Sequence, residues 1–383
     1  MTLRVDEVDS IAALERESDA WRDLLMRVPH DSPYLTPEFM IPWARMLAAR
    51  YRFRVLAVRD GEKLVGLAPL FERSLDKWGI GFTLRSFPLH GLSPPFDLII
   101  DPATPGVVDA LLLHLRGDGG WHLVELLNVP ATSPNVRALR EACGRLGFRF
   151  DEKTSLSTTY VPIQVNWDSY LESLPRKLRK SLRQGQRRLE QHGPVRFTRC
   201  PGDGMALSEG IAMALAVIAT SWKRFDEEPV DWSGFLRELG ERLAARNMLC
   251  LRFLMVGGRP AAYHLELDYR NNLHGLHNAY DLEMASGNPG AVLLADALRD
   301  AHNRGCGRFD FLGTKEYLER WAHARQDYLR LRIIGRRFGT GLKAALYDRV
   351  SRSRKARAAR EEEAQRLERL GRVPPDGGEQ GNS

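Results

Sequence analysis

The sequence predicts a mixed α/β fold built from two tandem copies of one unit, each a twisted mixed sheet flanked by helices. One order of elements (strand, Gly-containing turn, strand, strand, helix, strand) occurs over residues 54–127 and again over 251–312. Element order that recurs within one chain indicates an internal repeat. The length of 383 residues also suits two domains of ordinary size better than one.

The first unit begins at Thr36-Pro37-Glu38, where a capping hydroxyl, a proline and an acid suit the first turn of a helix over 39–49. Two apolar runs around Asp60-Gly61 predict a hairpin with a tight two-residue turn. The elements expected next are strands near 82–87 and 97–100, a helix over 106–115, a strand over 122–127, a helix over 135–146 and a strand near 148–150.

A long helix over 167–191 is expected to lead into the second unit, because Leu171, Leu174, Leu178, Leu182 and Leu189 form one apolar stripe at helical spacing. The elements expected after it are helices over 204–222 and 232–246, a hairpin around Gly257-Gly258, a strand over 273–280, a helix over 291–303 and strands over 309–312 and 328–334. The expected domains are therefore residues 1–160, residues 161–335, and a basic tail over 336–383 that is helical and then disordered.

The net charge of +7 comes from two short segments. Residues 176–188 contain seven Arg or Lys and no acid, and residues 335–360 contain nine bases and one acid. Together these two segments are more positive than the chain as a whole, so the remaining residues have a net negative charge. This distribution predicts local anion sites rather than a broad nucleic-acid surface.

Several classes of protein are excluded or disfavoured. The apolar runs fall short of the about 20 residues that a transmembrane helix needs, and the first residues do not resemble a signal peptide, so we expect a cytoplasmic protein. The four cysteines are widely spaced and predict free thiols rather than disulfides. No metal is expected, because no cysteine pair or His-Glu-x-x-His helix accompanies His264, His274 and His277.

Motifs along residues 30–335 resemble the GNAT superfamily of acyltransferases. Within it, they are similar to the CelD/BcsL-like acetyltransferase group, which is related to the Fem aminoacyltransferases. The resemblance depends on the order of the motifs 34–38, 174–183, 258–262, 289–290 and the segment from 309 to Trp321. Two features depart from it. The phosphate loop of the superfamily is matched only at Gly290, and Leu318 stands where relatives carry Lys. The resemblance implies tandem GNAT-like lobes, with acyl-CoA, most simply acetyl-CoA, as the donor substrate.

The start of the 291–303 helix is the expected donor site. Asn288 suits the N-cap, Pro289 suits the first turn, and Gly290 permits a close approach. Unpaired N–H groups of Gly290 and Ala291, with the positive end of the helix dipole, suit a pyrophosphate such as that of CoA. The alternative is a well-capped helix after a hairpin.

Acyl transfer to an amine needs a base, donors for the oxyanion and an acid for the leaving thiolate. Strand alternation places His264, Glu266 and Asp268 on one face, where Glu266 is the first choice as base, with His264 and Asp268 as alternates. The same alternation places His274, Leu276, Asn278 and Tyr280 together on the next strand, with His277 opposite. The alternative for the first group is a solvated strand face.

Tyr280 is the expected proton donor to the thiolate, and Tyr317 is the second candidate and a substrate contact. Either tyrosine could instead be buried against a backbone carbonyl. Asp310 either binds the substrate amine or caps a turn. Arg179 and Arg183, on the basic helix, are expected to bind CoA phosphates, a tRNA or a lipid-linked pyrophosphate; the alternative is a solvated helix face.

These observations predict an N-acyltransferase that moves an acyl group to an amino group of a sugar or amino-acid-like precursor of the cell envelope or of a polysaccharide. The first alternative is a Fem-like transferase that uses aminoacyl-tRNA, and tRNA is then the one nucleic-acid partner expected. The second is a non-catalytic scaffold of polysaccharide or lipid assembly. Because the 336–360 tail is basic, a peripheral location at the inner membrane surface is also expected.

Overall fold

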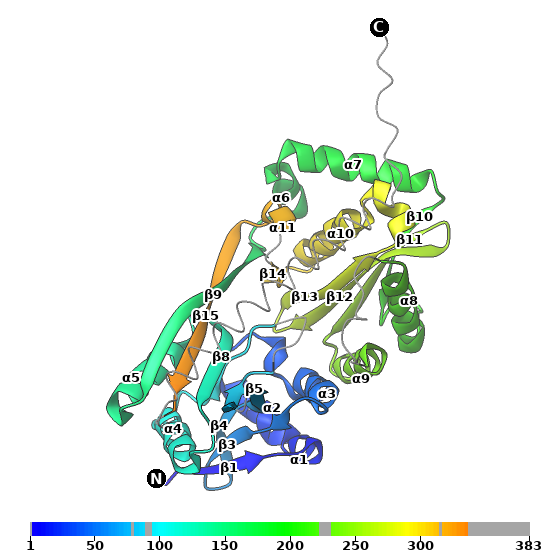
Figure 1. Cartoon of the computed structure of the whole chain (residues 1–383). Helices are drawn as coiled ribbons and strands as arrows, with labels where there is room; N and C mark the ends of the chain where they lie inside the picture. Colours follow the sequence, from blue (N-terminus) through cyan, green and yellow to red (C-terminus); the bar gives the residue numbers. More distant parts are fainter. Residues whose placement is uncertain (1, 78–79, 89–93, 222–230, 314–315, 336–383) are drawn as a thin grey trace. The chain divides into compact units, whose positions relative to one another are not determined.

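The computed structural model describes residues 2–77, 80–88, 94–221, 231–313 and 316–335, which lie within one compact unit of residues 1–337. The predicted tail over 336–383 lies outside the described residues. The fold is mixed α/β, with helices packed on mixed sheets, as the sequence predicts (Figure 1).

The first half of the chain alternates helices with short strands. Its helices are α1 (Ile11–Arg16), α2 (Ser18–Arg27), η1 (Pro33–Leu35), α3 (Pro37–Leu47), α4 (Val107–Asp118) and α5 (Pro134–Leu146). Its strands are β1 (Arg4–Val8), β2 (Arg52–Phe53), β3 (Val55–Asp60), β4 (Lys63–Ala68), β5 (Phe71–Lys77), β6 (Ile80–Ser86), β7 (Ile99–Ile100), β8 (Leu123–Pro130) and β9 (Arg149–Pro162).

The second half holds the expected hairpin, helix and strand. Its helices are α6 (Trp167–Ser173), α7 (Arg176–Glu190), α8 (Leu207–Thr220), α9 (Trp232–Ala244), η2 (Leu282–Gly287), α10 (Pro289–Asn303) and α11 (Glu316–Glu319). Its strands are β10 (Val195–Cys200), β11 (Leu249–Val256), β12 (Arg259–Tyr269), β13 (Asn272–Tyr280), β14 (Arg308–Asp310) and β15 (Ala324–Ile334).

The described strands form two sheets rather than one sheet per half. The smaller has the order β1-β3-β4-β7, and the larger has the order β10-β11-β12-β13-β14-β9-β15-β8-β6-β5-β2. The long strand β9 joins the halves, because it pairs with β14 on one side and with β15 on the other. The division into two lobes at residue 160 therefore stays a prediction, since this strand belongs to both.

Several boundaries differ from the sequence prediction, and three of them change the picture of the fold. The helix expected over 167–191 is divided into α6 and α7 at Leu174 and Pro175, because proline disfavours helical geometry in the residue before it. The strand expected near 148–150 continues to Pro162. The first hairpin turns at Gly61 and Glu62 rather than at Asp60-Gly61, since Asp60 pairs with Lys63.

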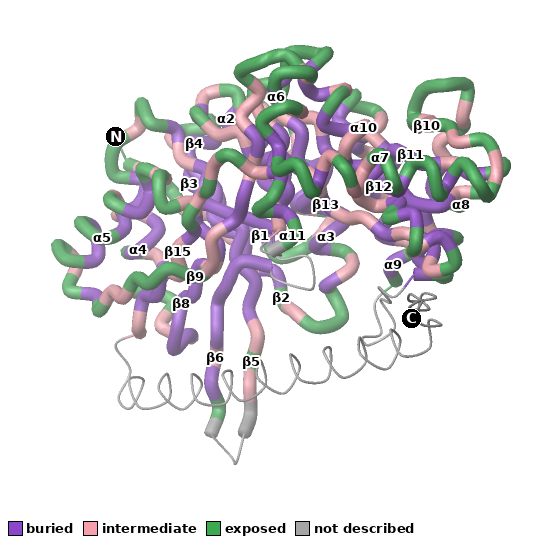
Figure 2. The backbone as a smooth tube through the Cα atoms, turned by 90° about the horizontal axis from the view of Figure 1, so that it is seen from above, coloured by how far each residue is buried: buried purple, intermediate pink, exposed green. Residues whose placement is uncertain are grey.

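Helices cover both faces of the sheet formed by β11, β12 and β13. Helix α10 lies on one face, while α8 and α9 pack against the other through Ile211, Leu236 and Leu239 (Figure 1). These strands are largely buried, whereas much of α7 is exposed (Figure 2). The core therefore holds the strands of the second half rigidly between two helix layers.

Arg270, in the β12–β13 turn, ties the second half to the first. Its guanidinium donates to the carbonyl oxygens of Leu25, Val28 and His30, at and beyond the end of α2. The carbonyl oxygens of Leu25 and Val28 also accept from the N–H groups of Val28 and His30, so the arginine adds a second donor to these carbonyls and fixes the loop over residues 28–31. This loop borders both sites described below.

Candidate functional site

Strands β13 and β14 pair only where they begin. Their parallel register covers Asn272 to His274 against Arg308 to Asp310. Strand β13 then continues to Tyr280 while pairing with β12 on its other side. Within the described residues, the edge of β13 from Gly275 to Tyr280 therefore has no strand partner on this side, and this unpaired stretch is called the gap between β13 and β14.

A β-bulge in β13 changes which side chains share a face. Leu265 pairs with His277, but the next residue, Glu266, pairs with Gly275. His274 and His277 therefore lie on the α8/α9 face, and Asn278 and Tyr280 lie on the α10 face. The predicted grouping of His274 with Asn278 and Tyr280 was wrong, because an extra residue in a strand shifts the alternation that follows it.

Helix α10 begins beside this gap. Asn288 has the left-handed conformation, with φ of 49°, and its side chain makes no capping hydrogen bond, contrary to the expected side-chain cap. Its carbonyl oxygen instead accepts from the N–H groups of Ala291 and Val292. Gly290 packs against the ring of Tyr280, and a Cβ there would lie 3.4 Å from Tyr280 Cδ1. The end of β13 and the start of α10 are thus in contact.

Helix α7 lies across the loop that leads into α10. Gly185 approaches the carbonyl oxygen of Gly287 so closely that a Cβ would lie 2.5 Å from it. Arg188 donates to the carbonyl oxygen of Ser286 at 3.0 Å. Arg179 is half-buried and Arg183 is exposed on the same helix. The basic helix therefore lies next to the start of α10, as an anion site at that helix end would require.

Tyr280 and Tyr317 are brought together at the gap. Asn278 hydrogen-bonds the hydroxyl of Tyr317, and Tyr280 lies within electrostatic range of it. Burial raises the pKa of Tyr317 although 45% of this residue is exposed, because its ring lies against the protein. The hydroxyl consequently stays protonated at neutral pH. The two tyrosines predicted as alternative acids thus form one cluster.

Glu266 lies in a buried ion pair instead of an open cleft. Its side chain is fully buried on the face covered by α10, 3.2 Å from the guanidinium of Arg252 and 3.3 Å from Nδ1 of His264. Arg252 also pairs with Asp296 and Asp300 of α10. Burial alone would raise the pKa of Glu266, but Arg252 and His264 outweigh burial and lower it to about 2.

A carboxylate with so low a pKa is a weak base at neutral pH. The alternative of a solvated face on β12 was wrong, because α10 covers His264 and Glu266. Glu266 and His264 anchor α10 to the sheet through Arg252. Sequence reasoning missed Arg252. The available signal was its place on β11, because Arg252 pairs with His264 and lies two residues from Cys250, the register partner of Glu266.

Asp310 lies at the other side of the gap, in a second buried polar cluster. The residue is 2% exposed, its carboxylate accepts from the N–H of Leu312 at 2.9 Å, and Nη2 of Arg308 is 3.7 Å away. Burial raises the pKa of Asp310 against the opposing effects of Arg308 and this N–H group. Asp310 thus caps the turn, as one alternative predicted, and is also more basic than an ordinary aspartate.

Unpartnered polar atoms surround Asp310. His274, its register partner on β13, is buried with no hydrogen bond to Nε2 in the described structure, and the same is true of the Tyr34 hydroxyl. The rings of Tyr34 and His274 are 6.0 Å apart. Burial and the neighbouring Arg308 lower the pKa of His274 to about 3, so the imidazole is neutral. Unpaired buried polar groups are uncommon and indicate a place for a polar ligand or water.

The described ranges contain no group of three or more His, Cys, Asp or Glu side chains placed to hold a metal ion. The four cysteines are free thiols, as predicted. No helix in the described part of the chain is long and apolar enough to cross a membrane.

Residues 176–330 match the family described as the acetyltransferase (GNAT) domain. The matched residues contain α7, the gap, the start of α10, the cluster around Glu266, and Asp310 with His274 and Arg308. No curated protein matches the chain.

Solved structures resemble nearly the whole chain at low identity. A structure of FemX is 14% identical, with a TM-score of 0.57, over 86% of this chain and 97% of that one. The C-terminal domain (DUF2156) of a putative lysylphosphatidylglycerol synthetase from Agrobacterium fabrum is 14% identical, with a TM-score of 0.51, over 88% and 96%. A protein of unknown function from Bacteroides thetaiotaomicron is 14% identical, with a TM-score of 0.50, over 87% and 100%. At such identity these structures support the fold alone, and with the family match they support an acyltransferase fold.

Proposed function

We propose that this protein is an N-acyltransferase that moves an acyl group, most simply acetyl, from acyl-CoA to an amino group of a sugar or amino-acid-like envelope or polysaccharide precursor. The observation that carries the proposal is the gap between β13 and β14, which ends at the start of α10 beneath the basic helix α7. An acetyltransferase (GNAT) domain match over the same residues agrees with it. Membership of the CelD/BcsL-like group is part of this proposal.

The donor would lie along the open edge of β13, on the α10 face. Its pyrophosphate would meet the N–H group of Gly290, with Arg183 and Arg179 adding positive charge from α7. The N–H of Ala291, which the sequence also offered to the donor, instead donates to the carbonyl oxygen of Asn288 at 3.1 Å. Its thioester would then reach the gap beside Tyr280 and Tyr317. Backbone N–H groups on the open edge of β13 would donate to the oxyanion.

The acceptor amine would approach from the opposite face, where Asp310 and His274 lie. The nitrogen attacks the thioester carbonyl, and Asp310 takes the proton that the nitrogen loses. The C–S bond then breaks, and Tyr280 or Tyr317 gives its proton to the thiolate. Glu266 and His264 would support α10 rather than touch the reacting atoms. Asp310 thereby replaces Glu266 as the base, because its pKa is raised while that of Glu266 is lowered.

Release of free CoA from acetyl-CoA in the presence of amines tests the proposal, with acetyl-CoA binding measured by thermal shift. We expect Tyr280→Phe combined with Tyr317→Phe to lower kcat by about 10²-fold, at the low end for loss of a general acid, while acetyl-CoA still binds. A chain that neither binds acetyl-CoA nor releases CoA with any amine would contradict the proposal and would favour a scaffold role.

The basic face of α7 favours one alternative, a transferase that uses aminoacyl-tRNA. Its seven bases without an acid could track an RNA backbone, and the structural resemblance to FemX covers most of the chain. This alternative predicts tRNA binding that weakens steeply with salt, and no thermal shift with acetyl-CoA. A thermal shift with acetyl-CoA and none with tRNA would discard it.

A further inference from the structure

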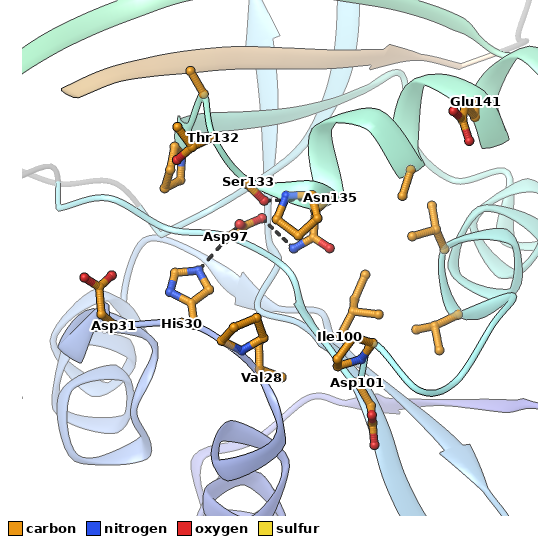
Figure 3. Close-up of a pocket in the computed structure, with 18 of the residues that line it drawn as sticks. Val28, His30, Asp31, Asp97, Ile100, Asp101, Thr132, Ser133, Asn135 and Glu141 are labelled. Carbon is orange, nitrogen blue, oxygen red and sulfur yellow. Dashed lines mark hydrogen bonds and ion pairs between the residues drawn. The ribbon is translucent and has the colours of Figure 1, made fainter. Parts of the chain in front are cut away.

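The first half of the chain contains a separate pocket of about 980 Å³, large enough for a small-molecule ligand. Its walls are the loop over residues 28–31, the loop over 97–106 with the start of α4, the turn before α5, and the beginning of β15 (Figure 3). Arg308 and Tyr160 complete the wall on the side of the larger sheet. None of these segments belongs to the proposed donor site.

Three polar side chains, Asp97, Asn135 and His30, form a polar floor at the edge of the pocket. Asp97 is 1% exposed, and its Oδ1 accepts from the N–H of Leu98 at 2.7 Å and from Nδ2 of Asn135 at 3.0 Å. Nε2 of His30 lies 3.5 Å from Oδ2 of the same carboxylate. The three side chains converge at the edge of the hollow (Figure 3). Packing and hydrogen bonds thus hold the polar floor in place before any ligand arrives.

The arginine side chains that line this pocket each form an ion pair with a carboxylate. Arg145 pairs with Asp109 at 2.8 Å, Arg308 pairs with Asp31 at 3.0 Å, and Arg325 pairs with Glu319. No lining arginine that the structure describes is left without a carboxylate, so none is free to bind a phosphate in the bidentate manner.

The acids of the wall outnumber its bases. Asp97 faces only His30 among basic groups in the described structure, and the exposed Asp327 bonds the hydroxyl of Ser157. Two lining acids are neutralised from outside the pocket: Arg27 and Lys63 lie 2.6 and 3.2 Å from Asp101, and Arg137 lies 2.8 Å from Glu141. The wall therefore favours a cationic ligand over an anionic one.

The pocket also borders the strands β9 and β14, of which β14 carries the proposed base. Tyr160 is the register partner of Asp310 on the neighbouring strand, and the guanidinium of Arg308 lies 5.5 Å from the centre of its ring. The same Arg308 is 3.7 Å from Asp310. One wall of the pocket is thus the strand segment that holds the proposed base.

We infer that this pocket holds the acceptor, and that the acceptor is a cationic amino compound, such as an amino sugar or an amino-acid amide, that carries no phosphate. The inference rests on the proposed function and narrows it, because nucleotide-linked and pyrophosphate-linked precursors are excluded as acceptors. Arg179 and Arg183, expected from the sequence to bind substrate, then serve the donor alone.

Calorimetric titrations of the full chain with glucosamine, N-acetylglucosamine, glucosamine 6-phosphate and lysine amide test the inference. Glucosamine or lysine amide should bind at least tenfold more tightly than the N-acetylated and phosphorylated probes. Asp97→Asn should weaken amine binding at least tenfold. Because that variant removes a buried group and can misfold, the exposed Asp327→Asn serves as a second variant, with a threefold or greater loss expected. Asp168→Asn, an exposed acid on α6, is the matched control and should bind normally.

Tighter binding of the phosphorylated probe, or no binding of either amine, would overturn the inference. Amine binding that Asp327→Asn and Asp97→Asn both leave intact would do the same. Acetyl-CoA titrated into the same preparations reports the donor site separately. If acetyl-CoA binds and the amines do not, the inference fails and the proposed function stands. If the amines bind and acetyl-CoA does not, the acyl-CoA function fails and the charge preference of the pocket stands.

Discussion

The helix starts of α10 and α4 occupy equivalent places in the two halves but carry opposite surroundings. Each follows a strand that pairs antiparallel with a hairpin, β13 beside β12 and β7 beside β4. Over the start of α10 lies the basic helix α7, whereas the start of α4 lies in a pocket walled by acids. A helix N-terminus alone attracts anions. In the account proposed here, the side chains around the start of α4 oppose that preference, and one scaffold would serve a phosphate-bearing donor and a cationic acceptor.

Asp310 is the proposed base, so its removal should have the largest effect on catalysis. We expect Asp310→Asn to lower kcat/KM by about 10²- to 10⁴-fold, because the amine loses its base. Acetyl-CoA affinity should stay unchanged in a direct titration. Because burial raises the pKa of Asp310, the wild-type rate should fall on acidification at a higher pH than an ordinary aspartate would give. An unchanged rate in Asp310→Asn would show that Asp310 is not the base.

Glu266→Gln should act on stability instead. The substitution breaks a buried ion pair, but Asp296 and Asp300 still face Arg252, so we expect a loss of about 3 kcal/mol in the free energy of unfolding. The folded pKa of about 2 lies below the ordinary value of 4.5, so this contribution is present above pH 4.5 and is lost as the pH falls toward 2. Denaturant unfolding at pH 7 and pH 3 measures it. A stable Glu266→Gln chain that is inactive would instead support Glu266 as the base.

The features on the α10 side of the contrast between the two helix starts were predictable from the sequence. Asn288-Pro289-Gly290 marks the start of α10, and the run of bases marks α7, because caps and charge runs are local properties of the chain. The bulge that separates His274 from Tyr280 was not predictable, since it depends on how β13 pairs with β12. The partners of Glu266 were missed for a similar reason: Arg252, Asp296 and Asp300 come from distant segments. The pocket around Asp97 and His30 likewise arises only when segments from across the chain fold together.

Gly290→Val tests the α10 side of the comparison. Its side chain would lie against Tyr280 at the place proposed for the donor, so we expect acetyl-CoA affinity to fall about tenfold or more, which corresponds to about 1.4 kcal/mol. Gly144→Val is the matched control, because Gly144 is also helical and a Cβ there meets no atom within 4 Å. Asp109→Asn, at the start of α4, should leave acetyl-CoA affinity unchanged. A loss in Asp109→Asn comparable with that in Gly290→Val would erase the distinction between the two helix starts.

Arg183→Glu should have the smallest effect, because it reverses a single exposed charge near the proposed donor site. We expect the KM for acetyl-CoA to rise about fivefold at low salt, and the difference from wild type to shrink as salt increases. Steady-state kinetics at two ionic strengths measures this. Lys153→Glu, which makes the same charge change on the exposed part of β9, should behave like wild type. Equal effects of the two substitutions would show that overall charge, rather than the position of α7, attracts the donor.

Hydrogen–deuterium exchange of the full chain with and without saturating acetyl-CoA tests the opposite roles of the two helix starts most directly. The account predicts slower exchange in peptides covering residues 275–293 and α7, with peptides covering 101–112 unchanged. Protection of residues 101–112, with none at the start of α10, would place the donor in the acidic pocket and contradict the assignment of the two sites.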